Sequence, residues 1–164
     1  MERERIIVGI DPDVEKSGVA ILHPDGKLKL CKMPFPELMD YLNLCARLSV
    51  DYTIVVEKGW FTTANYHLCS NHGLRYAAKQ GIDIGRNHET GRKIVEMAAH
   101  FGFKIEEVTP LKKIWKGRDG KITKEELESF TGPLPRCSQD ERDAALLAWV
   151  YSGRPIKIGR AGKP

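Results

Sequence analysis

The chain lacks the features of a membrane protein or of a disulfide-stabilised secreted protein. It contains no apolar run near the roughly 18 residues that a membrane-spanning helix requires. Its first residues, Met1 to Arg5, are too charged for a secretory signal. The cysteines lie far apart and form no C-x-x-C pair, so we expect reduced thiols rather than disulfides or a zinc site. These absences predict a cytoplasmic protein with no membrane association.

Internal repeats and low-complexity segments are also missing. A chain of 164 residues with 41% hydrophobic residues suits one globular domain and leaves no room for a second. We expect this domain to span residues 1–152. Residues 153–164 should form a basic, disordered tail.

Acidic residues are absent from the tail and scarce in one further segment. The tail's Arg154, Lys157, Arg160 and Lys163 account for the whole excess of 26 basic over 22 acidic residues. Residues 111–124, called here the basic segment, hold six basic residues and one acid, a local charge of +5. Such a segment favours a polyanionic partner, although a run of like charge is more often only a solvated face.

Apolar runs bounded by turn residues predict an α/β fold with a mixed five-stranded sheet. The predicted strands are residues 5–11, 17–23, 27–33, 51–57 and 103–108. The turn His23-Pro24-Asp25-Gly26 favours a tight connection, so the first three strands should form an antiparallel meander. An amphipathic helix over residues 36–48 provides a crossover, which predicts that the fourth strand runs parallel to the first.

Three later helices are indicated by an apolar stripe and by two capping motifs. The stripe is followed by Gly102 and consists of Ile94, Met97, Ala98 and Phe101. Thr123 and Ser138 each begin an S/T-x-x-E capping box, so each should be the N-cap of a helix. The second of these helices should run to Tyr151 and stop at Gly153.

Four carboxylates fall where these elements should meet. Asp11 and Glu57 each end a strand, and ligands of α/β sheets gather at the carboxyl ends of parallel strands. Asp140 and Asp143 lie at i and i+3 in the first turn of the last helix, where the helix dipole favours the ionised form. A lone acid of this kind is more often a turn or cap residue, but a cluster of four would repel unless cations were bound. The joint pattern predicts a metal site with hard oxygen ligands, the kind that Mg²⁺ requires. Glu141 is excluded from this site because it is better explained as a capping-box partner.

Four motifs occur in order over residues 6–150. They are Val8-Gly9-Ile10-Asp11-Pro12, Ser17-Gly18-Val19-Ala20, Val55-Val56-Glu57, and Asp140-Glu141-Arg142-Asp143-Ala144 with Leu147-Ala148. This series resembles that of RuvC-type Holliday junction resolvases, which are metal-dependent nucleases of the RNase H-like fold. The resemblance implies that the catalytic, metal-binding acids are Asp11, Glu57, Asp140 and Asp143. They would bind a pair of Mg²⁺ ions, for which Mn²⁺ can substitute, and hydrolyse phosphodiesters.

The resemblance also implies how the protein acts. A homodimer would resolve four-way DNA junctions by paired symmetric nicks, and a branch-migration helicase is a candidate partner. The apolar stripe that begins at Ile94 could form part of the dimer interface, although burial in the core is the simpler explanation.

Several residues are candidates for contacts with DNA. An acidic metal centre cannot hold DNA by itself, so we expect phosphate contacts from Lys112, Lys113, Lys116 and Lys121. Trp60 and Phe61 follow the Glu57 strand, where the resemblance places an aromatic residue that stacks on an unpaired base. Trp60 is the preferred candidate, with core packing as the alternative. Trp115 is expected to be a core residue.

The chain departs from the family pattern in two places. Asp13 stands where such families usually have glycine after the Asp-Pro pair; it is either a turn residue or a modifier of the metal site. The region 62–80, which we expect to be helical, matches no family motif, so its substrate contacts stay open.

Three other functions compete with the resolvase interpretation. Another RNase H-like nuclease could act on RNA–DNA hybrids or on branched or flap DNA. An actin- or hexokinase-like ATPase has a phosphate loop that also reads like residues 8–11, but that fold requires two domains and a longer chain. A non-catalytic nucleic-acid-binding module would be expected to have lost some of the acids, whereas this chain keeps all four.

Overall fold

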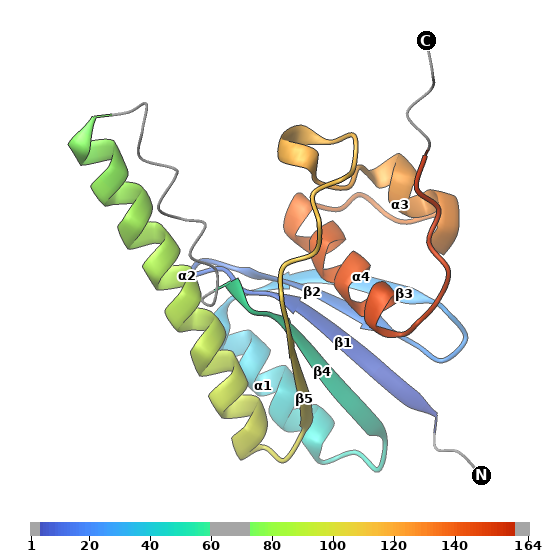
Figure 1. Ribbon diagram of the computed structural model, residues 1–164. Coiled ribbons are helices and arrows are strands. Elements are labelled where there is room, and N and C mark those ends of the chain that lie inside the picture. Colours follow the sequence, from blue (N-terminus) through green and yellow to red (C-terminus); the bar gives the residue numbers. More distant parts are fainter. Residues whose placement is uncertain (1–3, 60–72, 160–164) are drawn as a thin grey trace.

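The computed structural model describes residues 4–59 and 73–159, which form a five-stranded mixed sheet with helices on both faces (Figure 1). The strands are β1 (Arg5–Asp11), β2 (Ser17–Leu22), β3 (Leu28–Met33), β4 (Asp51–Glu57) and β5 (Lys104–Val108). The helices are α1 (Phe35–Ala46), α2 (Leu74–His100), α3 (Lys124–Thr131) and α4 (Gln139–Tyr151), with a short 3-10 helix, η3 (Arg118–Gly120).

The strand order is β3-β2-β1-β4-β5. The first three strands are antiparallel, and β4 and β5 run parallel to β1. The tight β2–β3 turn explains the antiparallel half, because His23 both donates to Lys27 (2.9 Å) and accepts from Gly26 (2.9 Å) through the backbone. Gly26 adopts φ +88°, which favours glycine. The predicted α/β fold and mixed sheet are therefore confirmed.

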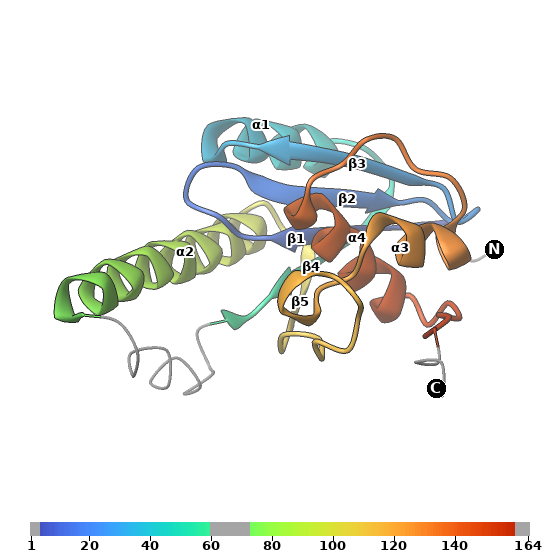
Figure 2. The same cartoon turned by 90° about the horizontal axis from the view of Figure 1, so that it is seen from above.

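Alternate residues of β1 face two separate cores. Val8 and Ile10 are fully buried against α1 and α2, while Ile7 and Gly9 face α4. Figure 2 shows α1 and α2 on one face of the sheet and α3 and α4 on the other. Ile94 and Ala98 are fully buried in the first core. Phe101 packs against the same core, so the core explanation is correct for these three residues of the stripe.

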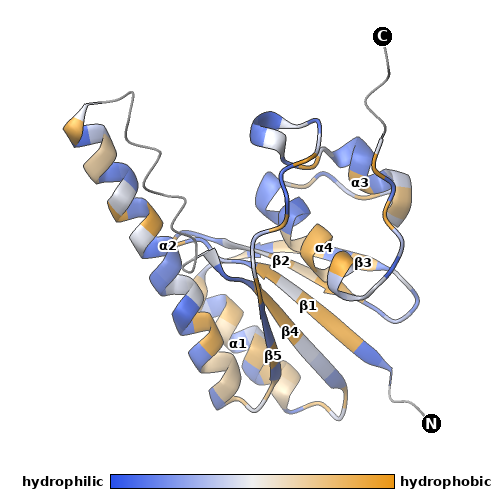
Figure 3. Ribbon diagram, viewed as in Figure 1, coloured by the Kyte–Doolittle hydropathy of each residue, from blue (hydrophilic) through white to orange (hydrophobic). Residues whose placement is uncertain are grey.

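Only the second half of α2 packs on the sheet. The helix has 27 residues, and its first half projects beyond the sheet and alternates between hydrophobic and hydrophilic residues (Figures 1 and 3). Leu74, Tyr76 and Ile82 are 90%, 49% and 55% exposed. Neither α2 nor any other helix in the described ranges is long and apolar enough to cross a membrane.

Both predicted capping boxes are formed. Glu126 donates its backbone N–H to the Thr123 hydroxyl (3.2 Å) and accepts the Thr123 N–H (3.0 Å). Ser138 and Glu141 make the same reciprocal pair at the start of α4. Glu141 is therefore used to begin the helix, as predicted. Trp115 is 8% exposed in the core beneath α3 and α4, which confirms its expected position.

Candidate metal centre

Two glycines allow α4 to lie directly on the sheet. A Cβ atom on Gly18 would lie 2.2 Å from the carbonyl oxygen of Asp140, and one on Gly9 would lie 2.4 Å from that of Ala144. Because these are backbone contacts, no side chain can be accommodated at either position. Gly18 pairs with Asp11 in the β1–β2 ladder. The first turn of α4 is therefore held beside the end of β1.

The carboxyl ends of β1 and β4 bring Asp11 and Glu57 together. The strands are parallel with Ile10 opposite Val56, so the next residue of each strand lies at the same edge. Burial, Glu57 and the acids of α4 raise the pKa of Asp11 to about 8. Burial and Asp143 also raise the pKa of Glu57. Carboxylates from three separate elements thus destabilise one another's ionised forms at one site.

The basic segment covers these acids. One cavity is lined by Asp11, Glu57 and Asp143 together with Lys112, Lys113, Trp115 and Lys121. The ammonium nitrogen of Lys121 lies 3.2 Å from Oδ2 of Asp143. Burial alone would lower the pKa of Lys121, but Asp143 and Asp11 outweigh burial and the pKa is raised. Lys121 and Lys113 partly offset the rise in the pKa of Glu57.

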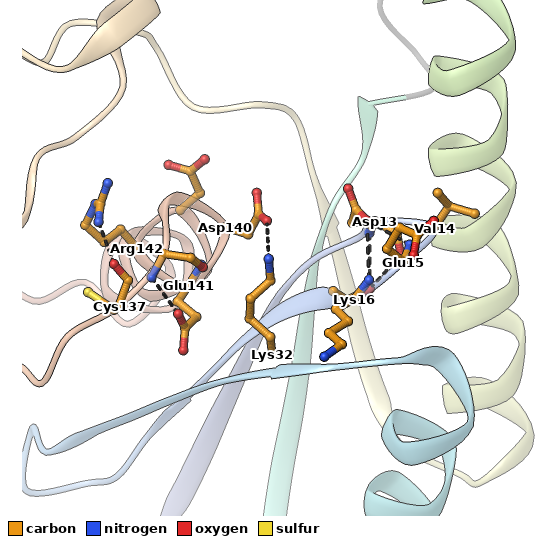
Figure 4. Close-up of polar contacts among 12 residues, drawn as sticks. Asp13, Val14, Glu15, Lys16, Lys32, Cys137, Asp140, Glu141 and Arg142 are labelled. Atoms are coloured by element: carbon orange, nitrogen blue, oxygen red, sulfur yellow. Dashed lines mark hydrogen bonds and ion pairs between the residues drawn. The ribbon is translucent and has the colours of Figure 1, made fainter.

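Asp140 is turned toward a different lysine. Its Oδ2 atom pairs at 3.1 Å with the ammonium group of Lys32 on β3, as Figure 4 shows. Lys32 lies opposite Gly18 in the β2–β3 ladder, so its side chain points to the same face as α4. In the described parts of the chain, no three metal-ligating side chains are grouped so that they could hold an ion.

A hydrogen-bonded brace that the sequence did not reveal orients Asp143. The Gln139 amide donates to Oδ1 of Asp143 (2.8 Å) and to the carbonyl of Ile122 (3.1 Å). Arg142 donates to Oε1 of Gln139 (2.8 Å) and to the carbonyl of Cys137 (2.8 Å). The i, i+4 spacing of Gln139 and Asp143 is the sequence signal that could have identified the first contact.

The β1–β2 loop identifies Asp13 as a turn residue. Its carboxylate accepts the backbone N–H groups of Glu15 (2.8 Å) and Lys16 (3.3 Å), which closes the loop on itself (Figure 4). Asn87 of α2 accepts the N–H of Val14 (2.9 Å) and so ties this loop to the long helix. No local pattern in the sequence indicated this contact, since it joins residues 73 positions apart.

The lysines predicted to contact DNA do not all lie at the cavity. Lys112, Lys113 and Lys121 line the cavity, whereas Lys116 does not. The backbone N–H of Lys116 is bound by Glu126 (3.1 Å), which ties the basic segment to α3. Trp60 and Phe61 lie outside the described residues.

The mixed sheet with acids at the carboxyl edge of β1 and β4 is the RNase H-like fold. No protein-family model and no curated protein matches the sequence. Among solved structures, RuvC from T. thermophilus in complex with Holliday junction substrate has a TM-score of 0.54 and 14% identity, over 90% of this chain and 92% of that chain. A second T. thermophilus RuvC structure has a TM-score of 0.45 and 15% identity, over 91% and 97%. Both of these neighbours are RuvC structures, the family that the motifs resemble, and the first of them confirms the shared fold.

Proposed function

We propose that this protein is a metal-dependent endonuclease that resolves four-way DNA junctions. The observation that carries the proposal is the convergence of Asp11, Glu57 and Asp143 in one lysine-lined cavity, with Asp140 close enough to raise the pKa of Asp11. Buried carboxylates that repel one another are stabilised by a proton or by a bound cation, and surrounding lysines suit a polyanionic substrate. The RNase H-like fold agrees with this chemistry.

The donor atoms of the four acids suit Mg²⁺ or Mn²⁺, although in the described parts of the chain the side chains are not grouped around one ion position. All four candidate ligands are carboxylates, the hard oxygen donors that these ions prefer. Asp11, Glu57, Asp140 and Asp143 would hold a pair of ions, which activate a water molecule and stabilise the leaving oxygen of a phosphodiester. Gln139 donates to one carboxylate oxygen of Asp143, Oδ1, and would therefore keep Asp143 oriented while its second oxygen binds the metal.

Lys32 and Lys121 act in this proposal as cations that the chain itself supplies. Each neutralises one acid of α4, and each would give up its carboxylate when a metal ion binds. The ammonium group of Lys121 then stays in the cavity beside Lys112 and Lys113, where all three can contact the phosphates of the substrate.

Paired nicks require two copies of the site, so we propose a homodimer. The exposed Leu74, Tyr76 and Ile82 on the projecting half of α2 make this helix the candidate interface. Sedimentation analysis of the native chain and of Ile82→Glu tests this: a dimer that the substitution dissociates is expected, and a monomeric native chain would rule it out. A branch-migration helicase remains a candidate partner on the strength of the motif resemblance alone.

The substrate class is tested by incubating the protein with a synthetic four-way junction, a linear duplex and an RNA–DNA hybrid, each with Mg²⁺ or EDTA. We expect Mg²⁺-dependent nicking of the junction at symmetric positions. Preferential cutting of the hybrid would favour another RNase H-like nuclease. Binding of the junction without cleavage by the native chain in either Mg²⁺ or Mn²⁺ would favour a non-catalytic module.

A further inference from the structure

Lys32 and the two strand acids lie in one row across the sheet. Lys32 pairs with Gly18 in the β2–β3 ladder, Gly18 pairs with Asp11 in the β1–β2 ladder, and Glu57 lies beside Asp11 at the end of β4. Because paired residues point their side chains to the same face of a sheet, all three charged side chains face α4. Neighbouring strands lie about 4.8 Å apart, so two strand steps separate Lys32 from Asp11 by about 10 Å.

The acids of this row have lysines on both sides. β5 is one edge strand of the sheet and leads into the basic segment, which brings Lys112, Lys113 and Lys121 to the cavity. β3 is the opposite edge strand and carries Lys32, which does not line that cavity. The ends of β1 and β4 therefore lie between the lysines of the basic segment and Lys32.

Lys32 also counters an acidic surrounding at the β3 edge. Its ammonium nitrogen is 3.1 Å from Oδ2 of Asp140 (Figure 4), and this hydrogen bond, together with the charges of Asp140, Asp13 and Glu141, raises the pKa of Lys32. Without Lys32, three carboxylates would repel a phosphate group that approaches from the β3 edge. The side chain of Lys32 is 36% exposed, so a substrate can reach it.

We propose that Lys32 binds a backbone phosphate of the DNA strand that crosses the four acids, on the side opposite to the basic segment. The identity of the polyanion rests on the proposed nuclease function. The strand would be held on both sides of the bond to be cut, by the basic segment and by Lys32. At a rise of about 3.4 Å per nucleotide, a separation of about 10 Å places this contact roughly three nucleotides from Asp11. Such a contact positions the strand and carries no sequence preference.

A different role for Lys32 would be to neutralise Asp140 and nothing more. The two roles are separated in the full chain with Asp140→Asn, because the ion pair is already lost there. In this background a lysine that only neutralised Asp140 has no effect on the salt dependence of DNA binding, whereas a lysine that binds phosphate has its full effect. Lys29→Met is the matched control for Lys32→Met, because Lys29 lies on the same strand but pairs with Ile21 and so points to the other face.

The test measures affinity for a linear duplex and a four-way junction in EDTA, from low to moderate salt. The three proteins are Asp140→Asn alone and Asp140→Asn with each lysine substitution. We expect Lys32→Met to make the slope of log affinity against log salt shallower by about 0.9, the value for one lost phosphate contact on duplex DNA. Lys29→Met should keep the parent slope within about 0.3. Equal slopes for the two lysine variants would overturn the proposal.

Nicking of the junction by the native chain in Mg²⁺ separates this proposal from the proposed nuclease function. A native chain that nicks the junction, combined with equal slopes for the two lysine variants, would overturn only the contact at Lys32. A native chain that cuts no DNA, combined with a shallower slope for Lys32→Met alone, would overturn the nuclease function and support the phosphate contact.

Discussion

The ammonium nitrogen of Lys121 lies 3.2 Å from the carboxylate of Asp143, inside the cavity that Asp11 and Glu57 also line. A lysine thus stands among the acids that we propose as metal ligands. It neutralises part of their repulsion, since it also lowers the pKa of Asp11 against the larger effects that raise it. Lysine and metal ion should therefore compete for Asp143.

Replacing Lys121 with methionine should expose this competition. The substitution keeps most of the apolar stem but removes the cation, so Mn²⁺ should bind more tightly, by about 3- to 10-fold after allowing for solvent screening at this half-exposed site. Binding of DNA should weaken at the same time because a phosphate contact is lost. Calorimetric titration with Mn²⁺ and a DNA-binding assay measure the two effects.

Lys116→Met is the matched control, because Lys116 lies in the same segment but outside the cavity. It should leave the affinity for Mn²⁺ unchanged. If both variants bind Mn²⁺ as the native chain does, Lys121 and the metal do not share a ligand.

The stability of the metal-free protein should depend on the ionisation of Asp11. Burial and the neighbouring acids raise its pKa from 3.8 to about 8. Because the folded state holds this proton more tightly than the unfolded state, the associated stability is complete below pH 4 and is lost as the pH rises through about 8. In EDTA the melting temperature should therefore fall between pH 5 and 8, and Mg²⁺ should oppose the fall by favouring the ionised carboxylate.

Asp11→Asn removes the titrating group. Its melting temperature in EDTA at pH 8 should exceed that of the native chain by about 3 to 9 °C, which corresponds to roughly 1 to 3 kcal/mol at this chain length. Melting temperatures of the two proteins that run parallel from pH 5 to 8 would show that Asp11 is not the responsible group.

The close packing of α4 on the sheet can be tested by substitution of Gly18. Alanine at this position would meet the carbonyl of Asp140, which cannot move without shifting the helix. We expect Gly18→Ala to lower the free energy of unfolding by about 2 to 3 kcal/mol and to weaken metal binding, because Asp140 and Asp143 are displaced together.

Gly81→Ala is the corresponding control in α2. Apart from the backbone of α2 itself, no atom of the described residues lies within 4 Å of a Cβ atom there, so the better helix propensity of alanine should stabilise the protein by about 0.5 to 1 kcal/mol. Urea unfolding measures both variants. A Gly18→Ala protein as stable as the native chain would contradict the close packing of α4.

Gln139 should act on the metal site and not on the fold. Its amide orients Asp143, so Gln139→Leu is expected to reduce Mn²⁺ affinity by about 10-fold. Urea unfolding should show a change below about 1 kcal/mol, because the site is half-buried and water can satisfy Ile122. Unchanged Mn²⁺ affinity would mean that Asp143 needs no brace.

Local chemistry explains why much of the fold could be predicted. The bounds of β1 and β4 agree with the expected 5–11 and 51–57 because proline and turn residues end the apolar runs. Thr123 and Ser138 each began a helix as expected, because a capping box satisfies donors within four residues. Three of the four candidate acids, Asp11, Glu57 and Asp140, stood out in the sequence for the same reason, because each lies at or beside the end of an element.

Contacts that depend on the order of strands could not be predicted. Lys32 can pair with Asp140 because both residues lie next to Gly18: Lys32 is its partner in the β2–β3 ladder, and the backbone of Asp140 packs on it. The first half of α2 carries no sustained apolar stripe, so the bounds of this helix could not be predicted. Residues 62–80 were expected to be helical, and of these the structure places 74–80 in α2. The hydrogen bond between Asn87 and the β1–β2 loop was not predicted either.

The most direct test measures Mg²⁺-dependent nicking of a four-way junction by four single variants, Asp11→Asn, Glu57→Gln, Asp140→Asn and Asp143→Asn. Asp25→Asn, in the exposed β2–β3 turn, is the control. We predict that each of the four loses at least about 100-fold in nicking rate while it still binds the junction, and that Asp25→Asn is unaffected. Nicking by any of the four at the rate of the control would contradict a shared metal centre.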